Sequence, residues 1–271
     1  MTTASPWRGR VWVLGAVVLL WAPFLPLLLR AVAANSPYPE VVPSTFTGRG
    51  LVQAFAPSGR VLEGLVLSVL TASVVAVLAC AVAWPAGRAL GQHRFRGRGF
   101  IKLLLLAPVV VPPMAATMGL QVFFIRLGLA HTPFGVALVQ LVPALPYAIF
   151  VLEAGFANFD RSYERQARAL GARRLRRWWS LTLPLMLPWL VAAAVLAFLV
   201  SWSDYTLTLL VGGGQVQTLP ILLFAAVGSS DTTLAASLAL LVMLPPIVLT
   251  AAAARQLSGG APAEIAIGGL G

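Results

Sequence analysis

Six long apolar stretches run through this sequence, and they restrict its fold more than any other feature. Each reaches or approaches the roughly 20 apolar residues that an α-helix needs to cross a lipid bilayer. We place the spans near residues 11–33, 62–85, 101–125, 133–155, 184–206 and 233–253. Of the 271 residues, 59% are hydrophobic and only 10% are charged, whereas a soluble domain carries about 25% charged residues. The sequence therefore predicts an all-α integral membrane protein with six transmembrane helices.

The basic residues are sorted by loop. Fifteen of the nineteen Lys and Arg residues fall in segments that lie on one side of the six-span arrangement, and four fall on the other. Because basic residues concentrate in cytoplasmic loops, we expect both termini and the loop 156–183 to be cytoplasmic. The net charge of +11 then reflects topology and attraction to anionic lipid headgroups. It does not indicate a nucleic-acid partner.

The chain divides into three parts along its length. We expect a cytoplasmic N-terminus at 1–10, a six-span domain at 11–255 and a cytoplasmic tail at 256–271. The first apolar run exceeds the 7–15 residues of a signal-peptide core, so it is expected to be a span. We find no internal repeat, and a transporter with two symmetric halves would therefore take its second half from another chain.

The sequence lacks the residue patterns of an enzyme or a metal site. Lys102, the only lysine, follows Ile101, so there is no Gly-Lys-Ser/Thr loop to cradle a nucleotide phosphate. His93 and His131 fall on opposite sides of the predicted membrane, and Cys80 is the only cysteine. These residues cannot form a catalytic triad or a zinc site within one chain. We therefore expect no enzymatic activity, no metal and no cofactor in this chain.

A polar, charge-dense segment at 160–184 separates the fourth and fifth apolar stretches. Asp160 can cap a helix over 161–170, and Gly171 can end it in the left-handed conformation. On that helix, Tyr163, Ala167 and Leu170 recur at i, i+4 and i+7 and form an apolar stripe. A short helix of this kind suits docking into a groove of a soluble partner.

The second half of the segment, 172–182, has a different pattern. Leu175, Trp178, Trp179 and Thr182 share one helical face, and arginines occupy the opposite face. Tryptophans over a basic face are typical of an interfacial helix that lies on the inner leaflet. The alternative for the whole segment is a plain basic loop whose Trp and Arg residues anchor the neighbouring spans.

The spacing within this segment supports a more specific interpretation. Nine residues follow Gly171 before Leu181-Thr182-Leu183-Pro184, and Glu164 lies just before three slots that hold Arg165, Gln166 and Ala167. The segment resembles the signature loop of ATP-binding-cassette importer permeases of the type I, MetI-like superfamily. That loop reads Glu-Ala-Ala, three residues, Gly, nine residues, Ile, one residue, Leu-Pro. Arg165 stands where the family has glutamate.

Further segments fit the same resemblance, which covers about residues 60–253. They are Trp84-Pro85-Ala86-Gly87-Arg88, Leu106-Ala107-Pro108, Ala144-Leu145-Pro146-Tyr147, Ser201-Trp202-Ser203-Asp204 and Thr218-Leu219-Pro220. The Leu170-Gly171-Ala172 form is similar to that of polyamine, ferric-iron, thiamine, phosphonate and sulfate systems. The pattern is closest to the spermidine/putrescine-type permeases.

The resemblance implies a permease subunit of a binding-protein-dependent importer in a bacterial inner membrane. The implied partners are a second six-span permease, two copies of a cytoplasmic ATPase that bind ATP and Mg²⁺, an external solute-binding protein and membrane lipid. The residues implied to contact the ATPase are Tyr163, Glu164, Arg165, Ala167, Leu170, Gly171 and Pro184. The implied cargo is polyamine-like or another small charged compound, with sugar, phosphonate, sulfate, iron or thiamine as alternatives.

A few polar residues at membrane depth are candidates for a solute path. They are Thr117, Gln121, Gln140, Tyr147, Ser201 and Asp204. The alternatives are helix–helix hydrogen bonding for Gln140 and a solvated helix end for Asp204. Two other protein classes also remain open. An ion-coupled secondary transporter would need charged residues at mid-membrane, and a membrane scaffold would not need the loop spacing.

Overall fold

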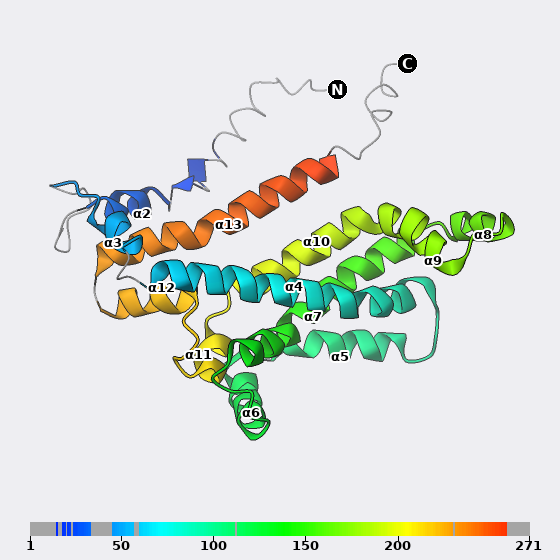
Figure 1. The fold of residues 1–271 in the computed structure, drawn as a ribbon, viewed down its shortest axis with the longest axis horizontal. Coiled ribbons are helices and arrows are strands. Elements are labelled where there is room, and N and C mark those ends of the chain that lie inside the picture. The colour runs from blue at the N-terminus through cyan, green and yellow to red at the C-terminus, as the bar shows by residue number, and fades with distance from the viewer. Residues whose placement is uncertain are drawn as a thin grey trace, which may run out of the picture. The chain divides into compact units, whose positions relative to one another are not determined.

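The computed structural model describes residues 15, 18–19, 21–22, 24–33, 45–56, 60–111, 113–229 and 231–258 (Figure 1). Apart from one isolated bridge between Ala33 and Phe46, the regular structure in these residues is helical. The all-α prediction is confirmed. The chain forms two compact units, one made of residues 1–65 and 221–245 and the other of residues 66–220 and 246–271.

Four helices of the described residues are long and apolar enough to cross a membrane. They are α4 (Val61–Gln92), α7 (Pro133–Asn158), the continuous run Arg174–Trp202 and the Thr232–Ala253 part of α13 (Thr232–Ser258). They correspond to the second, fourth, fifth and sixth predicted spans. The first predicted span is described only in part, at residues 15, 18–19, 21–22 and 24–33, and its longest described helix is α2 (Phe24–Ala31). The count of six spans therefore stays a prediction.

The third predicted span, 101–125, is not one continuous helix, and its crossing of the membrane stays a prediction. It is divided into α5 (Arg98–Val110) and α6 (Pro113–Arg126). Between them, Val111 is extended, with φ −68° and ψ 132°. A residue that precedes a proline is forced away from the helical region, and Val111 precedes Pro112. The break follows from this local constraint, and neither piece alone has the length of a span.

Helix α4 packs closely against α7 because small residues line the contact. Ala79 and Ala83 have no exposed surface and share a core cluster with residues of α7. Farther along the same face, a Cβ added to Gly87 would lie 2.8 Å from the Leu152 Cβ, and one added to Gly91 would lie 2.6 Å from the Glu153 carbonyl oxygen. Small residues at four-residue spacing let two membrane helices approach each other in this way. The same packing carries α4 to Gln92, seven residues past the predicted end of its span.

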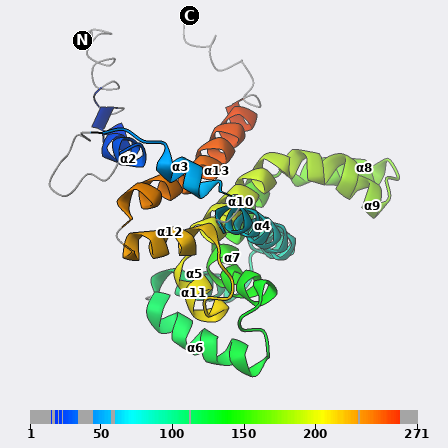
Figure 2. The ribbon, with the colours of Figure 1, turned by 60° about the vertical axis from the view of Figure 1, so that its left-hand side comes forward.

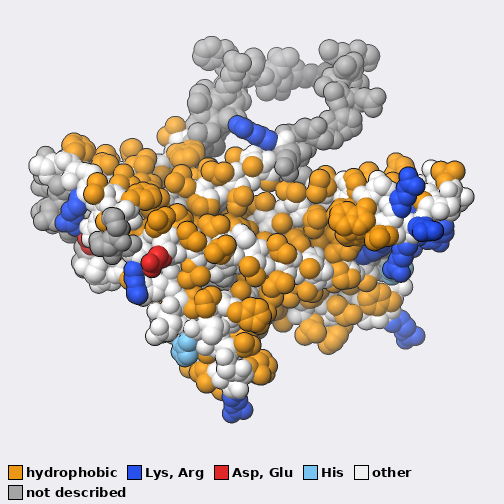
Figure 3. All heavy atoms as spheres, in the orientation of Figure 1, with side chains coloured by type: hydrophobic (Ala, Val, Ile, Leu, Met, Phe, Trp, Pro, Cys, Tyr) orange, Lys and Arg blue, Asp and Glu red, His pale blue; other side chains and the backbone are white. Residues whose placement is uncertain are grey.

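The core of the larger unit is shared by α4, α7 and α10 (Leu183–Trp202). Met186, Ala193 and Ala197 of α10 are buried in the same core cluster as Ile149 and Leu152 of α7. The opposite face of α4 carries exposed aliphatic side chains, at Val66, Leu70, Val74 and Val77. Hydrophobic side chains cover much of the face drawn in Figure 3, and basic side chains gather at the end formed by α8 and α9. An apolar outer surface of this kind suits contact with lipid.

Apart from the helices of the loop 156–183, three short helices of the described residues lie between or at the ends of the predicted spans: α3 (Arg49–Ala54), α11 (Thr206–Gly212) and α12 (Leu219–Gly228). In the smaller unit, Arg49 of α3 forms an ion pair with Asp231 at 2.8 Å. In the larger unit, α11 packs against α6 and α7. Helix α11 therefore lies where its polar side chains can form hydrogen bonds with polar residues of α7.

Candidate functional site

The polar loop contains the short helix α8 (Arg161–Ala169), with the boundaries expected from its sequence. The Asp160 carboxylate caps it, because it accepts hydrogen bonds from the Ser162 amide at 2.7 Å and from the Ser162 hydroxyl at 2.6 Å. These bonds hold the pKa of Asp160 below its usual range. After Leu170, Gly171 has φ 75° and the Ala172 amide donates to the Ala167 carbonyl oxygen. The predicted cap and left-handed stop are confirmed.

Helix α8 presents most of the predicted contact residues to solvent. Tyr163 is 49% exposed and Leu170 is 88% exposed, whereas Ala167 is half-buried. Arg165 and Pro184 are also exposed. These side chains are therefore free to meet a partner, and the assignment of that partner stays a prediction.

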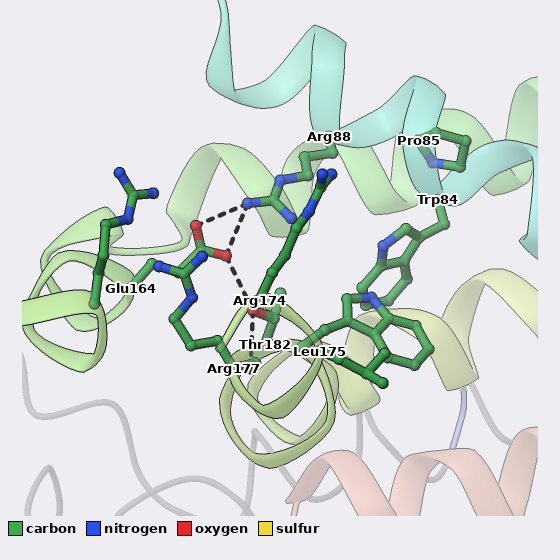
Figure 4. A pocket seen from close by; sticks show the side chains of 10 residues that line it. Trp84, Pro85, Arg88, Glu164, Arg174, Leu175, Arg177 and Thr182 are labelled. Atoms are coloured by element: carbon green, nitrogen blue, oxygen red, sulfur yellow. Dashed lines mark hydrogen bonds and ion pairs between the residues drawn. The ribbon is translucent and has the colours of Figure 1, made fainter. Parts of the chain in front are cut away.

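Glu164 differs from its neighbours because its side chain faces the body of the chain. Its two carboxylate oxygens accept hydrogen bonds from Nη2 of Arg88, on α4, at 2.8 and 2.7 Å. The Thr182 hydroxyl donates to the same carboxylate at 3.0 Å. Figure 4 shows the Glu164 carboxylate between Arg88 and Thr182. This carboxylate thus ties α8 both to α4 and to the start of the fifth apolar helix.

A cavity of about 750 Å³ opens beside this ion pair. Its lining combines four arginines, one carboxylate and two indole rings, from Trp84, Pro85, Arg88, Glu164, Arg168, Arg174, Leu175, Arg177, Trp178 and Thr182. The rings of Trp84 and Trp178 meet edge to face, with centroids 6.0 Å apart. In Figure 4, Arg174 extends from its helix toward the side of the cavity where Arg88 lies. The cavity is therefore strongly cationic and is bounded on one side by aromatic rings.

The segment after Gly171 is helical, as expected, but it is not a regular α-helix. α9 (Arg174–Arg177) passes into the π-helix η1 (Trp178–Thr182), where the Leu183 amide donates to the Trp178 carbonyl oxygen. Leu175 and Trp179 are exposed, while Thr182 is only 1% exposed. The prediction that Thr182 shares their face is wrong, because the π turn contains one residue more than an α-turn and changes the direction of Thr182.

Three of the residues predicted to line a solute path belong to one buried hydrogen-bond network. The Gln140 amide nitrogen donates to Thr208 Oγ1 at 2.9 Å and to Asp204 Oδ2 at 3.2 Å, and its oxygen accepts from the Ser201 hydroxyl at 2.6 Å. Asp204 also accepts from the Thr208 backbone amide at 2.9 Å. Gln140 thus has partners on two neighbouring elements, which is the geometry expected for the helix–helix alternative.

The other candidate path residues are on α6 and α7. Thr117 is buried and Gln121 half-buried on α6, and Tyr147 of α7 is 38% exposed. The assignment of these residues to a solute path stays a prediction.

The structure also brings together charged residues that the sequence analysis did not single out. On α7, the buried Glu153 accepts a hydrogen bond from Arg98 at 2.8 Å and forms an ion pair with Lys102, both of α5. An acidic residue within an apolar stretch was the available signal, since such residues are usually paired. Arg88 and Thr182 were also missed as partners of Glu164. No local pattern marks them, because each is distant from Glu164 in sequence.

Comparisons with known proteins agree with this architecture. The family described as "Binding-protein-dependent transport system inner membrane component" matches residues 83–259. Among solved structures, a bacterial ABC transporter involved in the import of the acidic polysaccharide alginate superposes with a TM-score of 0.71 at 14% identity, covering 94% of this chain and 99% of that one. At this identity the likeness shows the shared fold.

Two curated relatives are permeases named for different transported substances. The molybdenum transport system permease protein ModB of Mycobacterium tuberculosis (strain ATCC 25618 / H37Rv) is 35% identical over 175 residues, which cover 59% of this chain and 66% of that protein. This chain therefore spans just under two thirds of that relative's length. The putrescine transport system permease protein PotI of Escherichia coli (strain K12) is 27% identical over 230 residues, 82% of this chain and 80% of PotI. With its family match over 83–259 and its shared fold, the chain belongs to the family of inner-membrane components of binding-protein-dependent transport systems.

Proposed function

We propose that this chain is the permease subunit of an ATP-driven importer that receives its solute from an external binding protein. The observation that carries the proposal is α8, a capped helix whose exposed Tyr163 and Leu170 stand on a polar loop between two apolar helices. The family match over residues 83–259 supports it. A helix with an exposed apolar stripe suits docking into a partner's groove.

In this proposal, two cytoplasmic ATPases bind ATP and Mg²⁺, and one of them docks on α8. A second six-span permease completes the path for the solute. Because Glu164 ties α8 to Arg88 on α4 and to Thr182, a displacement of α8 is passed directly to two membrane helices. The bundle then changes between inward-open and outward-open states as its ligands bind.

We propose a small charged solute as the cargo. The names of the relatives point to both a polyamine and an oxyanion, since PotI is a putrescine permease and ModB a molybdenum permease. The candidate path residues favour a cation, because Asp204 is their only charged member and it carries a carboxylate. An anion near Asp204 would meet repulsion between like charges.

The test is to copurify the chain with its ATPase, second permease and binding protein, and to reconstitute the complex in proteoliposomes. ATP hydrolysis should rise when the binding protein is loaded with its cargo. A panel that includes putrescine and molybdate separates the two cargo classes, and stimulation by molybdate alone would overturn the cationic cargo. Uptake driven by an ion gradient without ATP would instead indicate a secondary transporter. A complex without solute uptake in either condition would indicate a scaffold.

A further inference from the structure

We propose that the cavity between α4, α8 and α9 binds the phosphate headgroup of an anionic phospholipid. This inference goes beyond transport, because it assigns a lipid site to the chain. It uses the proposed orientation of the chain in the membrane only to identify the leaflet that supplies the lipid. The first reason is the charge of the cavity. Four guanidinium groups and one carboxylate line it, which leaves a net charge of +3.

The single carboxylate in the lining is already engaged. Both Glu164 oxygens accept from Arg88, and one also accepts from Thr182. Arg168, Arg174 and Arg177 are the remaining cationic groups. Nη1 of Arg177 is buried and has no hydrogen-bond partner among the described residues. A buried donor without a partner is costly, so the cavity favours a ligand that brings oxygen acceptors.

A phosphate group matches this lining. Its oxygens accept the paired N–H groups of a guanidinium, which is the geometry in which arginine binds phosphate most strongly. Basic pockets between membrane helices also hold anionic lipid headgroups. The cavity volume of about 750 Å³ is larger than a single phosphate ion needs, and it leaves room for the glycerol part of a headgroup.

The surroundings favour a lipid over a free anion. The arginine-bearing helix α9 runs through η1 directly into the apolar helix α10, so the cavity lies at the end of a membrane-length helix. Leu175 and Trp179 beside the cavity are 69% and 59% exposed, and Leu185 and Leu187 on α10 are 47% and 51% exposed. Exposed tryptophan next to arginine is typical of the membrane interface. A lipid would place its headgroup in the cavity and its acyl chains along these leucines.

The experiment measures lipid binding to the purified full-length chain by native mass spectrometry in a non-ionic detergent. The probes are dioleoyl phosphatidylglycerol, dioleoyl phosphatidylcholine with the same chains, and inorganic phosphate. The test variant is R174Q/R177Q. The matched control is R173Q/R176Q, which removes the same charge from exposed positions of the same segment that do not line the cavity.

We expect the wild-type chain to prefer phosphatidylglycerol. R174Q/R177Q should weaken its binding by on the order of tenfold to thirtyfold, given the usual contribution of a basic residue near anionic lipid. R173Q/R176Q should bind as the wild type does. R174K/R177K should keep the preference for phosphatidylglycerol, because it keeps the charge. If R174Q/R177Q does not remain monodisperse, the single variants R174Q and R173Q replace the pair.

Three results would overturn the proposal. Equal weakening in the test and control variants would show a general effect of surface charge. Displacement of phosphatidylglycerol by equimolar inorganic phosphate would show a site for a free anion. Unchanged lipid binding by R174Q/R177Q would show that the cavity does not hold the lipid. If the same variant also loses the ATPase from the complex in pure phosphatidylcholine membranes, the cavity contacts the protein partner instead.

Discussion

At the scale of single residues, two glycines are required for different reasons. Gly91 provides close approach, because a Cβ there would lie 2.6 Å from the Glu153 carbonyl oxygen and 2.8 Å from the Phe156 Cβ. Gly171 provides a backbone conformation, because its φ is 75° although a Cβ there would meet nothing within 4 Å. The first is a requirement of helix packing and the second a requirement of the chain's direction.

Gly91→Ala should lower the thermal stability of the purified protein, with a cost of about 1–3 kcal/mol for overpacking. The matched control is Gly119→Ala, in helix α6, where an added Cβ meets nothing within 4 Å. Alanine favours the helix over glycine by roughly 0.5–1 kcal/mol, so the control should be neutral or stabilising. Unfolding followed by intrinsic fluorescence in detergent measures both. Equal stability of the two variants would contradict the close contact of α4 and α7.

The Asp160 cap should make the order of α8 depend on pH only in acid. The folded-state pKa of Asp160 lies below its ordinary value of 3.8, because Ser162 donates two hydrogen bonds to the carboxylate. A depressed pKa contributes stability above the unfolded-state value, and this contribution is lost as the pH falls through the folded-state value. We expect amide protection of α8 to be constant from neutral pH down to about pH 5 and to fall below about pH 4. Asp160→Asn keeps a cap but should abolish this acid transition.

At the scale of elements, the position of α8 depends on an ion pair that joins parts of the chain 76 residues apart. Arg88 and Glu164 are partly buried, with 35% and 14% of their side-chain surface exposed, and the Arg88 guanidinium also lies 5.9 Å from the Phe156 ring centroid. Such a pair is stronger than a fully exposed one, because water screens it less. It links the exposed loop to membrane helix α4.

A double-mutant cycle on Arg88→Gln and Glu164→Gln should measure this link. We expect a coupling energy of about 0.5–1 kcal/mol, typical of a partly exposed pair, and faster proteolysis of the α8 loop in each single variant. Arg161→Gln, on the same helix but exposed, is the control and should not couple to Arg88. Additive effects of the two substitutions would show that the pair does not hold α8.

Gly171→Val should separate the ATPase from the complex while leaving the chain in the membrane. A β-branched residue is strongly disfavoured at φ 75°, and the strain, about 1 kcal/mol or more, falls at the end of the docking helix. Gly99→Val is the control, because an added Cβ there also meets nothing within 4 Å and its φ is not positive. Normal ATPase retention by Gly171→Val would reduce the loop to a membrane anchor.

At this scale, an element could be predicted from the sequence where the residues that determine it lie close to it in the chain. The boundaries of α8 follow from Asp160 and Gly171, which are adjacent to the helix that they cap and end. Pro112 supplies a local reason for the break at Val111, but apolar content alone does not distinguish one span from two shorter helices. The bond from Thr182 to Glu164 was missed because it depends on the π turn, which the hydrophobic period does not reveal.

At the scale of the whole molecule, the sorting of basic residues predicts which side of the membrane each loop occupies. In a Cys80→Ala background, a cysteine at exposed Leu127, between α6 and α7, should react with an impermeant thiol reagent in intact cells. A cysteine at exposed Arg165 should react only after permeabilisation. Both cysteines lie in exposed segments, so the difference in their reactivity should depend only on the side of the membrane on which each one lies. The reverse pattern would place α8 out of reach of a cytoplasmic ATPase.

The π turn at Trp178–Thr182 has a mechanical consequence for the helix that it interrupts. A π turn holds one residue more than the α-turn it replaces. If the same residues closed into an α-turn, everything before them would rotate by about 100° around the helix axis and advance by about 1.5 Å. The turn thus couples two movements of α9 relative to α10. Rotation of the arginine-bearing end and displacement along the axis are coupled by the backbone itself, at the point where the Thr182 hydroxyl holds Glu164.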